Sequence, residues 1–148
     1  MLVHDKQKVL ALIPQKPPFV MVDALRAASD QEAETVFFID PRNILCEQNL
    51  FSEAGLIENI AQSAALHMGY LCQQKNIPPP KGFIGDVKDL KIYALPTAGS
   101  HISTRIYVED LIFGVTLLLG EIFQNGKQLA SCRMKVFTLN DNNTPAGI

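Results

Sequence analysis

The chain has 148 residues, of which 47% are hydrophobic and 19% are charged, and its net charge is −2 at pH 7. These values are typical of one ordinary globular domain with a sizeable core, and they argue against nucleic-acid binding, which requires a strongly basic surface. No run of about 18 apolar residues is present to span a bilayer. Residues 1–15 mix charges into too short an apolar stretch for a signal peptide. We therefore expect a cytoplasmic protein with no membrane partner.

The first part of the chain predicts a short helix, two strands and a loop. The short helix is expected to end near Leu12. Residues 19–28, FVMVDALRAA, and residues 33–40, AETVFFID, are rich in β-branched and aromatic side chains, which favour strands. Polar residues 29–32 separate these two segments, so we expect a hairpin. Residues 40–51 are predicted to form a loop.

One long helix is predicted from Ser52 to Gln74, with Ser52 as its N-cap and Glu53 at the positive end of the helix dipole. At about 100° per residue, the apolar side chains fall in one arc: Ile57, Ile60, Ala61, Ala64, Ala65, Met68, Leu71 and Cys72. A second arc is polar and contains Glu58, Asn59, Gln62 and Ser63. We expect the apolar arc to be buried and the polar arc to be presented outward. Prolines at 78–80 end the helix.

Four more strands are predicted after the prolines, at residues 82–95, 101–110, 114–124 and 127–139. Gly85 predicts a bulge or a close backbone approach within the first of them. Asn125-Gly126 is the strongest short signal for a two-residue type I′ hairpin. Apolar and polar residues alternate in the last strand, which indicates an antiparallel sheet with one wet face.

These elements predict an α+β fold in which one antiparallel sheet of about six strands covers one long helix. A single domain is expected over residues 1–148, with a core from about residue 9 to residue 139 and a frayed tail over residues 140–148. The sheet edges and the polar arc of the helix have no partner in this arrangement. We therefore expect a symmetric dimer.

Glu58 is the strongest candidate for chemistry. It lies on the first turns of the long helix, after Gly55 and four residues before Gln62. Free N–H groups at a helix amino terminus can polarise a carbonyl oxygen, and a glycine there lets a substrate approach closely. A polarised thioester beside a carboxyl group is suited to elimination or hydrolysis. The alternative is a solvated glutamate on the outer face of an amphipathic helix.

The histidines and cysteines predict no second site. His67 lies nine residues after Glu58, which is about 13 Å further along the helix axis and on its opposite side, so the two cannot share a site within one chain. An exposed or structural role is favoured for His4 and His101. The cysteines are far apart and odd in number, which predicts buried thiols rather than disulfides or a zinc site: Cys46, Cys72 and Cys132. The sequence has no phosphate loop, metal-ligand spacing or nucleophile elbow.

Three segments together resemble the hotdog-fold 3-hydroxyacyl-acyl-carrier-protein dehydratases. Residues 12–25, LIPQKPPFVMVDAL, resemble that family's Leu-Leu-Pro-His-x-x-Pro-Phe-Leu-Leu-Val-Asp opening. Residues 55–65, GLIENIAQSAA, are similar to its helix, and residues 82–100 resemble its later Phe-x-Gly strand and Pro-Gly-Asp turn. The resemblance spans residues 9–139 and is greatest to the divergent branch associated with aryl polyene pigment pathways.

The resemblance implies a hotdog fold, in which the sheet wraps around one central helix, and a substrate carried by acyl carrier protein on phosphopantetheine. It implies a dehydratase in fatty acid or aryl polyene biosynthesis, with no cofactor and no metal. Glu58 is the implied catalytic residue. The implied substrate-binding residues are Gln15, Phe19, Gly55, Gln62 and Gly85.

Two departures from the family pattern affect the expected activity. Residues 46–55, CEQNLFSEAG, replace the family's Gly-His-Phe-Pro-Gly segment, and Gln15 stands where the family carries its catalytic histidine. The family's histidine removes the C2 proton while the carboxyl group assists departure of the C3 hydroxyl. A neutral amide is not a base near pH 7, and losing a general base typically costs about 10² to 10⁴ in rate.

In the resembling dehydratases, the histidine and the acid of one site come from different subunits of a dimer. The first reading is therefore a composite enzyme, in which Glu58 completes a site with a second, histidine-bearing chain, while Gln15 leaves the other site silent. A homodimer is the alternative to this pair of different chains. The second reading is a non-catalytic acyl-binding or scaffolding subunit. The third is a hotdog acyl thioesterase in which Glu58 works with water.

Overall fold

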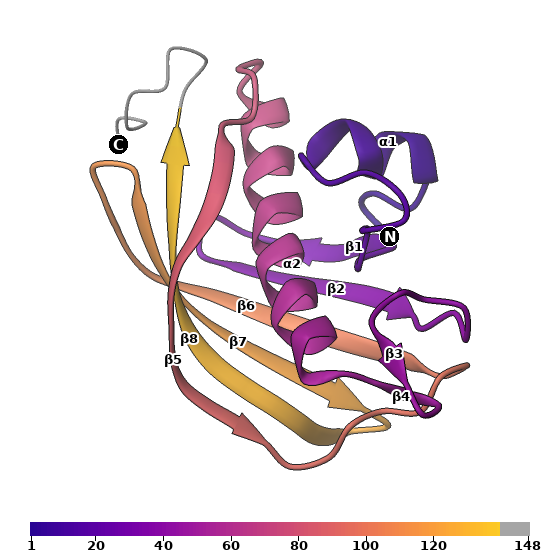
Figure 1. The fold of residues 1–148 in the computed structure, drawn as a ribbon. Coiled ribbons are helices and arrows are strands. Elements are labelled where there is room, and N and C mark those ends of the chain that lie inside the picture. The colour runs from indigo at the N-terminus through magenta and orange to yellow at the C-terminus, as the bar shows by residue number, and fades with distance from the viewer. Residues whose placement is uncertain (140–148) are drawn as a thin grey trace.

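The computed structural model of the chain describes residues 1–139, and its main feature is a curved sheet wrapped around one long helix (Figure 1). The helices are α1 (Lys6–Leu12) and α2 (Glu53–Gln74), and the strands of this sheet are β1 (Ala24–Ala28), β2 (Glu32–Phe38), β5 (Lys81–Ile92), β6 (His101–Ile112), β7 (Val115–Gln124) and β8 (Lys127–Leu139). The strand order is β1-β2-β6-β7-β8-β5, and each neighbouring pair is antiparallel. The predicted α+β fold, a six-stranded antiparallel sheet around one long helix, is confirmed. The predicted tail, residues 140–148, lies outside the described residues.

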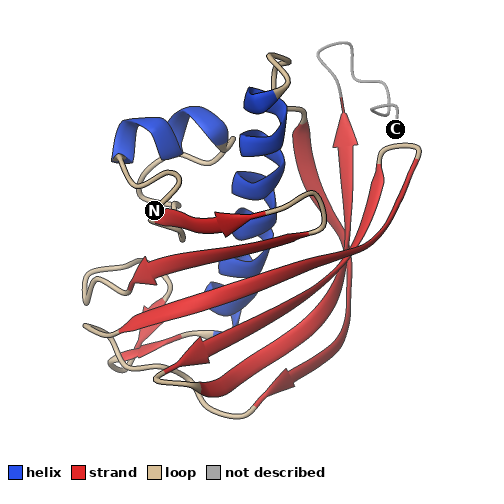
Figure 2. Cartoon of the chain, turned by 180° about the vertical axis from the view of Figure 1, so that it is seen from behind, coloured by secondary structure: helices blue, strands red, loops and turns tan. Residues whose placement is uncertain are grey.

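The helix α2 lies on one face of the sheet, and a view from behind shows the strands in front of it (Figure 2). Gly120 of β7 allows the sheet and α2 to come into close contact, because a side chain at this position would collide with Ile60 of α2. On another side of α2, the end of α1 packs at Gly69, where a Cβ would collide with Leu12. Neither helix within residues 1–139 is both long and apolar enough to cross a membrane.

The predicted turn and cap chemistry is confirmed. Asn125 and Gly126 have φ values of 51° and 79°, as a type I′ turn requires. The register of β5 against β8 shifts between Ile84 and Asp86, so the predicted bulge is at Gly85. Ser52 is the N-cap of α2, and its side chain accepts a hydrogen bond from Gly55 N at 3.2 Å.

Two predicted segments are wrong in part. The strand expected over residues 19–28 is shorter, because β1 begins only at Ala24. The backbone groups of Phe19 and Met21 instead bond to amide side chains of α2, which take the place of a neighbouring strand. The loop expected over residues 40–51 contains a small second sheet, formed by β3 (Cys46–Glu47) and β4 (Leu50–Phe51).

The predicted orientation of α2 is also wrong. Most of its polar arc is buried, since Asn59, Gln62 and Ser63 have no exposed surface, and only Glu58 is half buried. Asn59 donates to Met21 O at 2.7 Å and accepts from the Thr104 hydroxyl. Ser63 shares a hydrogen bond of 2.7 Å with the hydroxyl of Thr35. Because every one of these polar groups has a partner, the polar arc can face the core, while most of the apolar arc is only half buried.

Candidate active site

A cavity of about 900 Å³ lies along the half-buried apolar arc of α2. Its helix wall contains Ala61, Ala64, Ala65, Met68 and Leu71. The facing wall comes from the sheet and from the start of β5, and includes Phe83, Ile84, Ile106, Val108, Leu118 and Val136. Small alanine side chains leave the space between helix and sheet unfilled. A long, largely apolar cavity of this kind is suited to a hydrocarbon chain.

Glu58 is the carboxylate of the α2 wall. Its Oε2 accepts a hydrogen bond of 2.9 Å from Gln62 Nε2, one helical turn further on. Gln62 is itself held, because its Nε2 also donates to Phe19 O at 2.8 Å and its Oε1 accepts from Met21 N at 2.5 Å. A fully buried amide with three partners therefore orients the Glu58 carboxylate toward a fixed position.

Gln15 lines the same cavity as Glu58. The Gln15 Oε1 atom is buried and has no hydrogen-bond partner within residues 1–139. Buried polar atoms of this kind are rare and are usually satisfied by another group. The amide can donate to or accept from a bound molecule, but it has no basic lone pair for removing a proton from carbon.

The other residues expected to bind substrate do not line this cavity in the described chain. Gly55 is buried, and a Cβ there would lie 2.5 Å from the ring of Phe51, so its small size is required for packing. Phe19 contributes its carbonyl to the support of Gln62, while its ring is 61% exposed. Gly85 is exposed and leaves room for the ring of Phe137. Their roles with substrate stay predictions.

The prediction that His67 and Glu58 cannot share a site within one chain is wrong for the cavity as a whole, because both residues line it. His67 is only 2% exposed, and its Nε2 lies 2.7 Å from the carbonyl oxygen of Ser29. Burial lowers the pKa of this imidazole below its usual value, although the Ser29 carbonyl and the nearby Asp30 favour the charged form. A lone histidine in a helix gave no local signal, because its partner is 38 residues away in the sequence.

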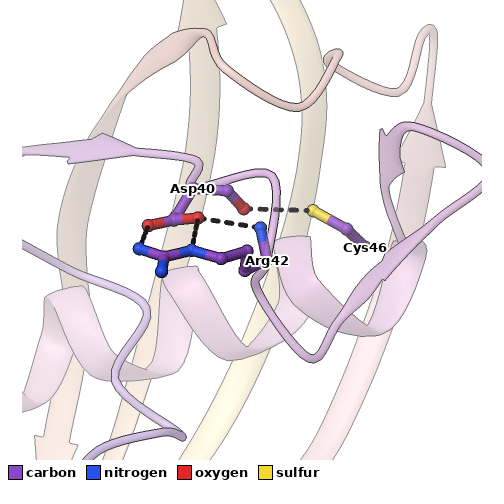
Figure 3. A network of polar contacts seen from close by, with 3 residues as sticks. All are labelled: Asp40, Arg42 and Cys46. Atoms are coloured by element: carbon purple, nitrogen blue, oxygen red, sulfur yellow. Dashed lines mark hydrogen bonds and ion pairs between the residues drawn. The ribbon is translucent and has the colours of Figure 1, made fainter.

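The loop before α2 is ordered by a small polar network (Figure 3). Asp40 accepts hydrogen bonds from the side chain and the backbone N–H of Arg42, at 2.8 to 3.3 Å, and these bonds hold the pKa of the Asp40 carboxyl below its usual value. The Cys46 thiol donates to Asp40 O at 3.7 Å, and burial raises the pKa of this thiol. Cys46 lies in the segment over residues 46–55, directly before and into the first turn of α2.

Within residues 1–139, no group of three His, Cys, Asp or Glu side chains is arranged to hold a metal ion. The three cysteines are free. Cys72 and Cys132 are buried as expected, whereas the prediction is wrong for Cys46, which is only half buried. Burial raises the pKa of the Cys132 thiol to about 11. The ionisable side chains that line the cavity include Asp30, Glu58, His67 and Lys75.

A curved antiparallel sheet around one long helix, with a cavity between them, defines a protein of the hotdog fold. The chain belongs to the ApeP-like family of ApeP dehydratases, which it matches over residues 7–146. No curated protein matches it.

Several solved structures are similar to this chain in fold. The dehydratase heterocomplex ApeI:P from Xenorhabdus doucetiae is similar with a TM-score of 0.79 and 17% identity, covering 91% of this chain and 93% of that chain. A hypothetical thioesterase from Streptococcus pneumoniae TIGR4, solved with coenzyme A, has a TM-score of 0.63 and 9% identity, covering 83% and 90%. The PaaI protein of E. coli, from the phenylacetic acid degradation operon, has a TM-score of 0.59 and 13% identity, covering 76% and 80%. At these identities the likeness shows the fold alone.

Proposed function

We propose that this chain is one subunit of a composite 3-hydroxyacyl-acyl-carrier-protein dehydratase, in which Glu58 supplies the carboxyl group and a partner chain supplies the base. The observation that carries the proposal is the fixed Glu58 carboxylate on an apolar cavity that also contains Gln15. The acyl chain would lie along the alanine wall of α2. Membership in a dehydratase family supports elimination of water as the reaction.

The proposed reaction divides the work between two groups. The base removes the proton from C2, and the Glu58 carboxyl group gives a proton to the C3 hydroxyl. Water leaves, and a double bond forms between C2 and C3. Gln62 holds Glu58 in position through its own bonds to the backbone of Phe19 and Met21. Gln15 can bind a substrate oxygen, but it cannot be the base.

The partner surface proposed for this reaction is the edge strand β5. It pairs with β8 on one side, and no strand of residues 1–139 pairs with its other side. Apolar side chains at and beside this edge are exposed, with Phe83 at 53%, Ile84 at 38% and Phe137 at 44%. An open edge with exposed apolar groups is suited to pairing with a second chain. The heterocomplex formed by the ApeI:P dehydratase supports a partner that differs from this chain.

The test is dehydration of a 3-hydroxyacyl carrier-protein substrate by this chain, by a histidine-bearing dehydratase subunit and by the two together, measured as loss of one water by mass spectrometry. In the complex, Glu58→Gln keeps the size of the side chain and removes the acid, so we expect the rate to fall by about 10² to 10⁴. Glu53→Gln is the matched control, since Glu53 is exposed on the first turn of the same helix and does not line the cavity. Full activity of the Glu58→Gln complex would refute the assignment.

A second variant separates a missing base from a missing site. Gln15→His in the chain alone is expected to produce dehydration that the unchanged chain lacks. The same assays also test the two alternative functions. A thioesterase would release the free acid, whereas a non-catalytic scaffold would bind the acyl chain and yield neither the dehydrated product nor the free acid. The thioesterase reading is favoured only by the likeness in fold to the hypothetical thioesterase of Streptococcus pneumoniae TIGR4.

A further inference from the structure

Two threonines of the sheet bond to α2, and only one of these contacts leads on to Glu58. Thr35 of β2 and Thr104 of β6 lie directly opposite each other in the pairing of the two strands. Thr104 donates to Asn59 Oδ1 at 2.5 Å. Thr35 shares a hydrogen bond of 2.7 Å with Ser63, one helical turn further along α2. All four of these side chains are at most 1% exposed, so the sheet makes two closely similar buried contacts with the helix.

The contact through Thr104 continues to Met21. A carbonyl oxygen only accepts hydrogen bonds, so the atom of the Asn59 amide that lies 2.7 Å from Met21 O must be the NH₂ nitrogen. Oδ1 of the same amide then faces Thr104, whose hydroxyl is its one donor among the hydrogen bonds of residues 1–139. Without this hydroxyl, Oδ1 would be a buried acceptor with no partner. Thr104 therefore fixes which way the Asn59 amide is turned.

Met21 connects this amide to Glu58. The Met21 N–H donates to Gln62 Oε1 at 2.5 Å, so the backbone of this one residue is held at its carbonyl by Asn59 and at its N–H by Gln62. Gln62 Nε2 in turn donates to Glu58 Oε2 at 2.9 Å. A continuous series of hydrogen bonds thus joins a hydroxyl of β6 to the carboxylate on the cavity wall. The other threonine contact is not connected to this series by any hydrogen bond within residues 1–139.

We propose that Asn59 and Thr104 are positioning residues for Glu58 in the dehydration. Neither of them lines the cavity, so they act on the carboxylate only through Met21 and Gln62. This inference rests on the proposed function, because it takes Glu58 to be the acid. An acid that must reach one hydroxyl in the transition state loses rate when its position is loosened. Binding of the acyl chain along the alanine wall does not depend on that position, so kcat should fall while KM stays the same.

The experiment compares Thr104→Val with Thr35→Val in the complex with a histidine-bearing dehydratase subunit. Both changes remove one buried hydroxyl at nearly constant side-chain volume, so both should lower the urea midpoint. Thr104→Val should lower kcat for the 3-hydroxyacyl carrier-protein substrate by about ten- to a hundredfold at an unchanged KM. Thr35→Val is the matched control and should leave kcat unchanged. Thr104→Ser, which keeps the hydroxyl, should restore most of the rate.

These variants separate positioning from a purely structural role. An equal loss of kcat in the two valine variants would show that any weakened contact between sheet and helix slows the reaction, and it would overturn the inference. Unchanged kcat in Thr104→Val, with a large loss in Glu58→Gln, would overturn the inference and leave the proposed function intact. Full activity of Glu58→Gln would overturn both.

A second measurement reports on the positioning without a partner chain. Hydrogen exchange of the Met21 backbone N–H, followed by NMR on the full-length protein, measures how often its bond to Gln62 opens. The rate is taken relative to the core amides of β7, which removes the effect of lower overall stability. Exchange should be about tenfold faster in Thr104→Val, as expected for the loss of one hydrogen bond, and unchanged in Thr35→Val. Equal exchange in the two variants would overturn the inference.

Discussion

Two faces of the same helix, α2, have opposite relations to the core. The face with Asn59, Gln62 and Ser63 is polar and fully buried, whereas the face with Ala61 and Ala64 is apolar and only half buried. The polar face is held by hydrogen bonds to the segment before β1 and to threonines of the sheet. The apolar face lines the cavity.

This difference shows that a side chain can be buried either because it is hydrophobic or because all its polar groups are hydrogen-bonded. A buried amide is tolerated when all its groups are paired, and it then fixes geometry more sharply than a hydrocarbon side chain does. Gln62 uses this property to connect the Phe19–Met21 backbone to Glu58. The apolar face is left free for a ligand. Changes to the polar face should therefore lower the free energy of unfolding, and changes to the apolar face should lower the affinity for an acyl ligand.

The largest effect on stability is expected for Gln62→Leu. This change leaves Met21 N–H and Phe19 C=O without their partner in the core, and each buried unpaired group costs about 1 to 3 kcal/mol, so the free energy of unfolding should fall by about 2 to 6 kcal/mol. Urea unfolding measures this change in the free energy of unfolding. The matched control is Gln73→Leu, on the exposed end of the same helix, which should stay within about 0.5 kcal/mol of the unchanged protein. Equal losses in both variants would show that the polar face is not the anchored one.

A smaller effect is expected when the same side chain is added to adjacent positions on the two faces. Ser63→Leu breaks the bond to Thr35 and overpacks the core, which costs about 1 to 3 kcal/mol. Ala64→Leu extends into the cavity, so the free energy of unfolding should change little while the affinity for a long-chain acyl pantetheine falls. Calorimetry and urea unfolding on both variants test the contrast. A large loss of stability in Ala64→Leu with unchanged affinity would mean that the cavity is closed in solution.

The faces of α2 also mark the limit of what its sequence could predict. The helix, its N-cap Ser52 and the two arcs follow from local spacing, and Glu58 was predicted as the carboxylate from its place near the helix amino terminus. Which arc is buried depends on contacts with Phe19 and Met21, about forty residues earlier, and no local pattern contains that information. The usual rule that apolar residues are buried therefore gave the wrong face.

The same reasoning explains why His67 was assigned no function. Its position on the helix is local, but the carbonyl that fixes its ring belongs to Ser29 in the turn between β1 and β2. The β6 residue Thr104 was likewise read only as part of a strand. Turns such as Asn125-Gly126 and the bulge at Gly85 were predicted correctly because the backbone conformation there depends on the residues themselves.

The smallest expected effect is a dependence of stability on pH that comes from His67, at the border of the two faces. Burial lowers the pKa of His67 below its ordinary value of 6.5, while the Ser29 carbonyl and Asp30 offset part of this change. As the pH falls below 6.5, the unfolded chain binds a proton that the folded protein does not, so stability decreases until the pH reaches the lower pKa of the folded state. His67→Gln should therefore lose less stability than the unchanged protein as the pH falls below 6.5, as measured by urea midpoints. His4→Gln, at an exposed histidine, should behave like the unchanged protein. If the His67→Gln midpoint falls with pH as steeply as that of the unchanged protein, burial does not keep His67 neutral in the folded protein.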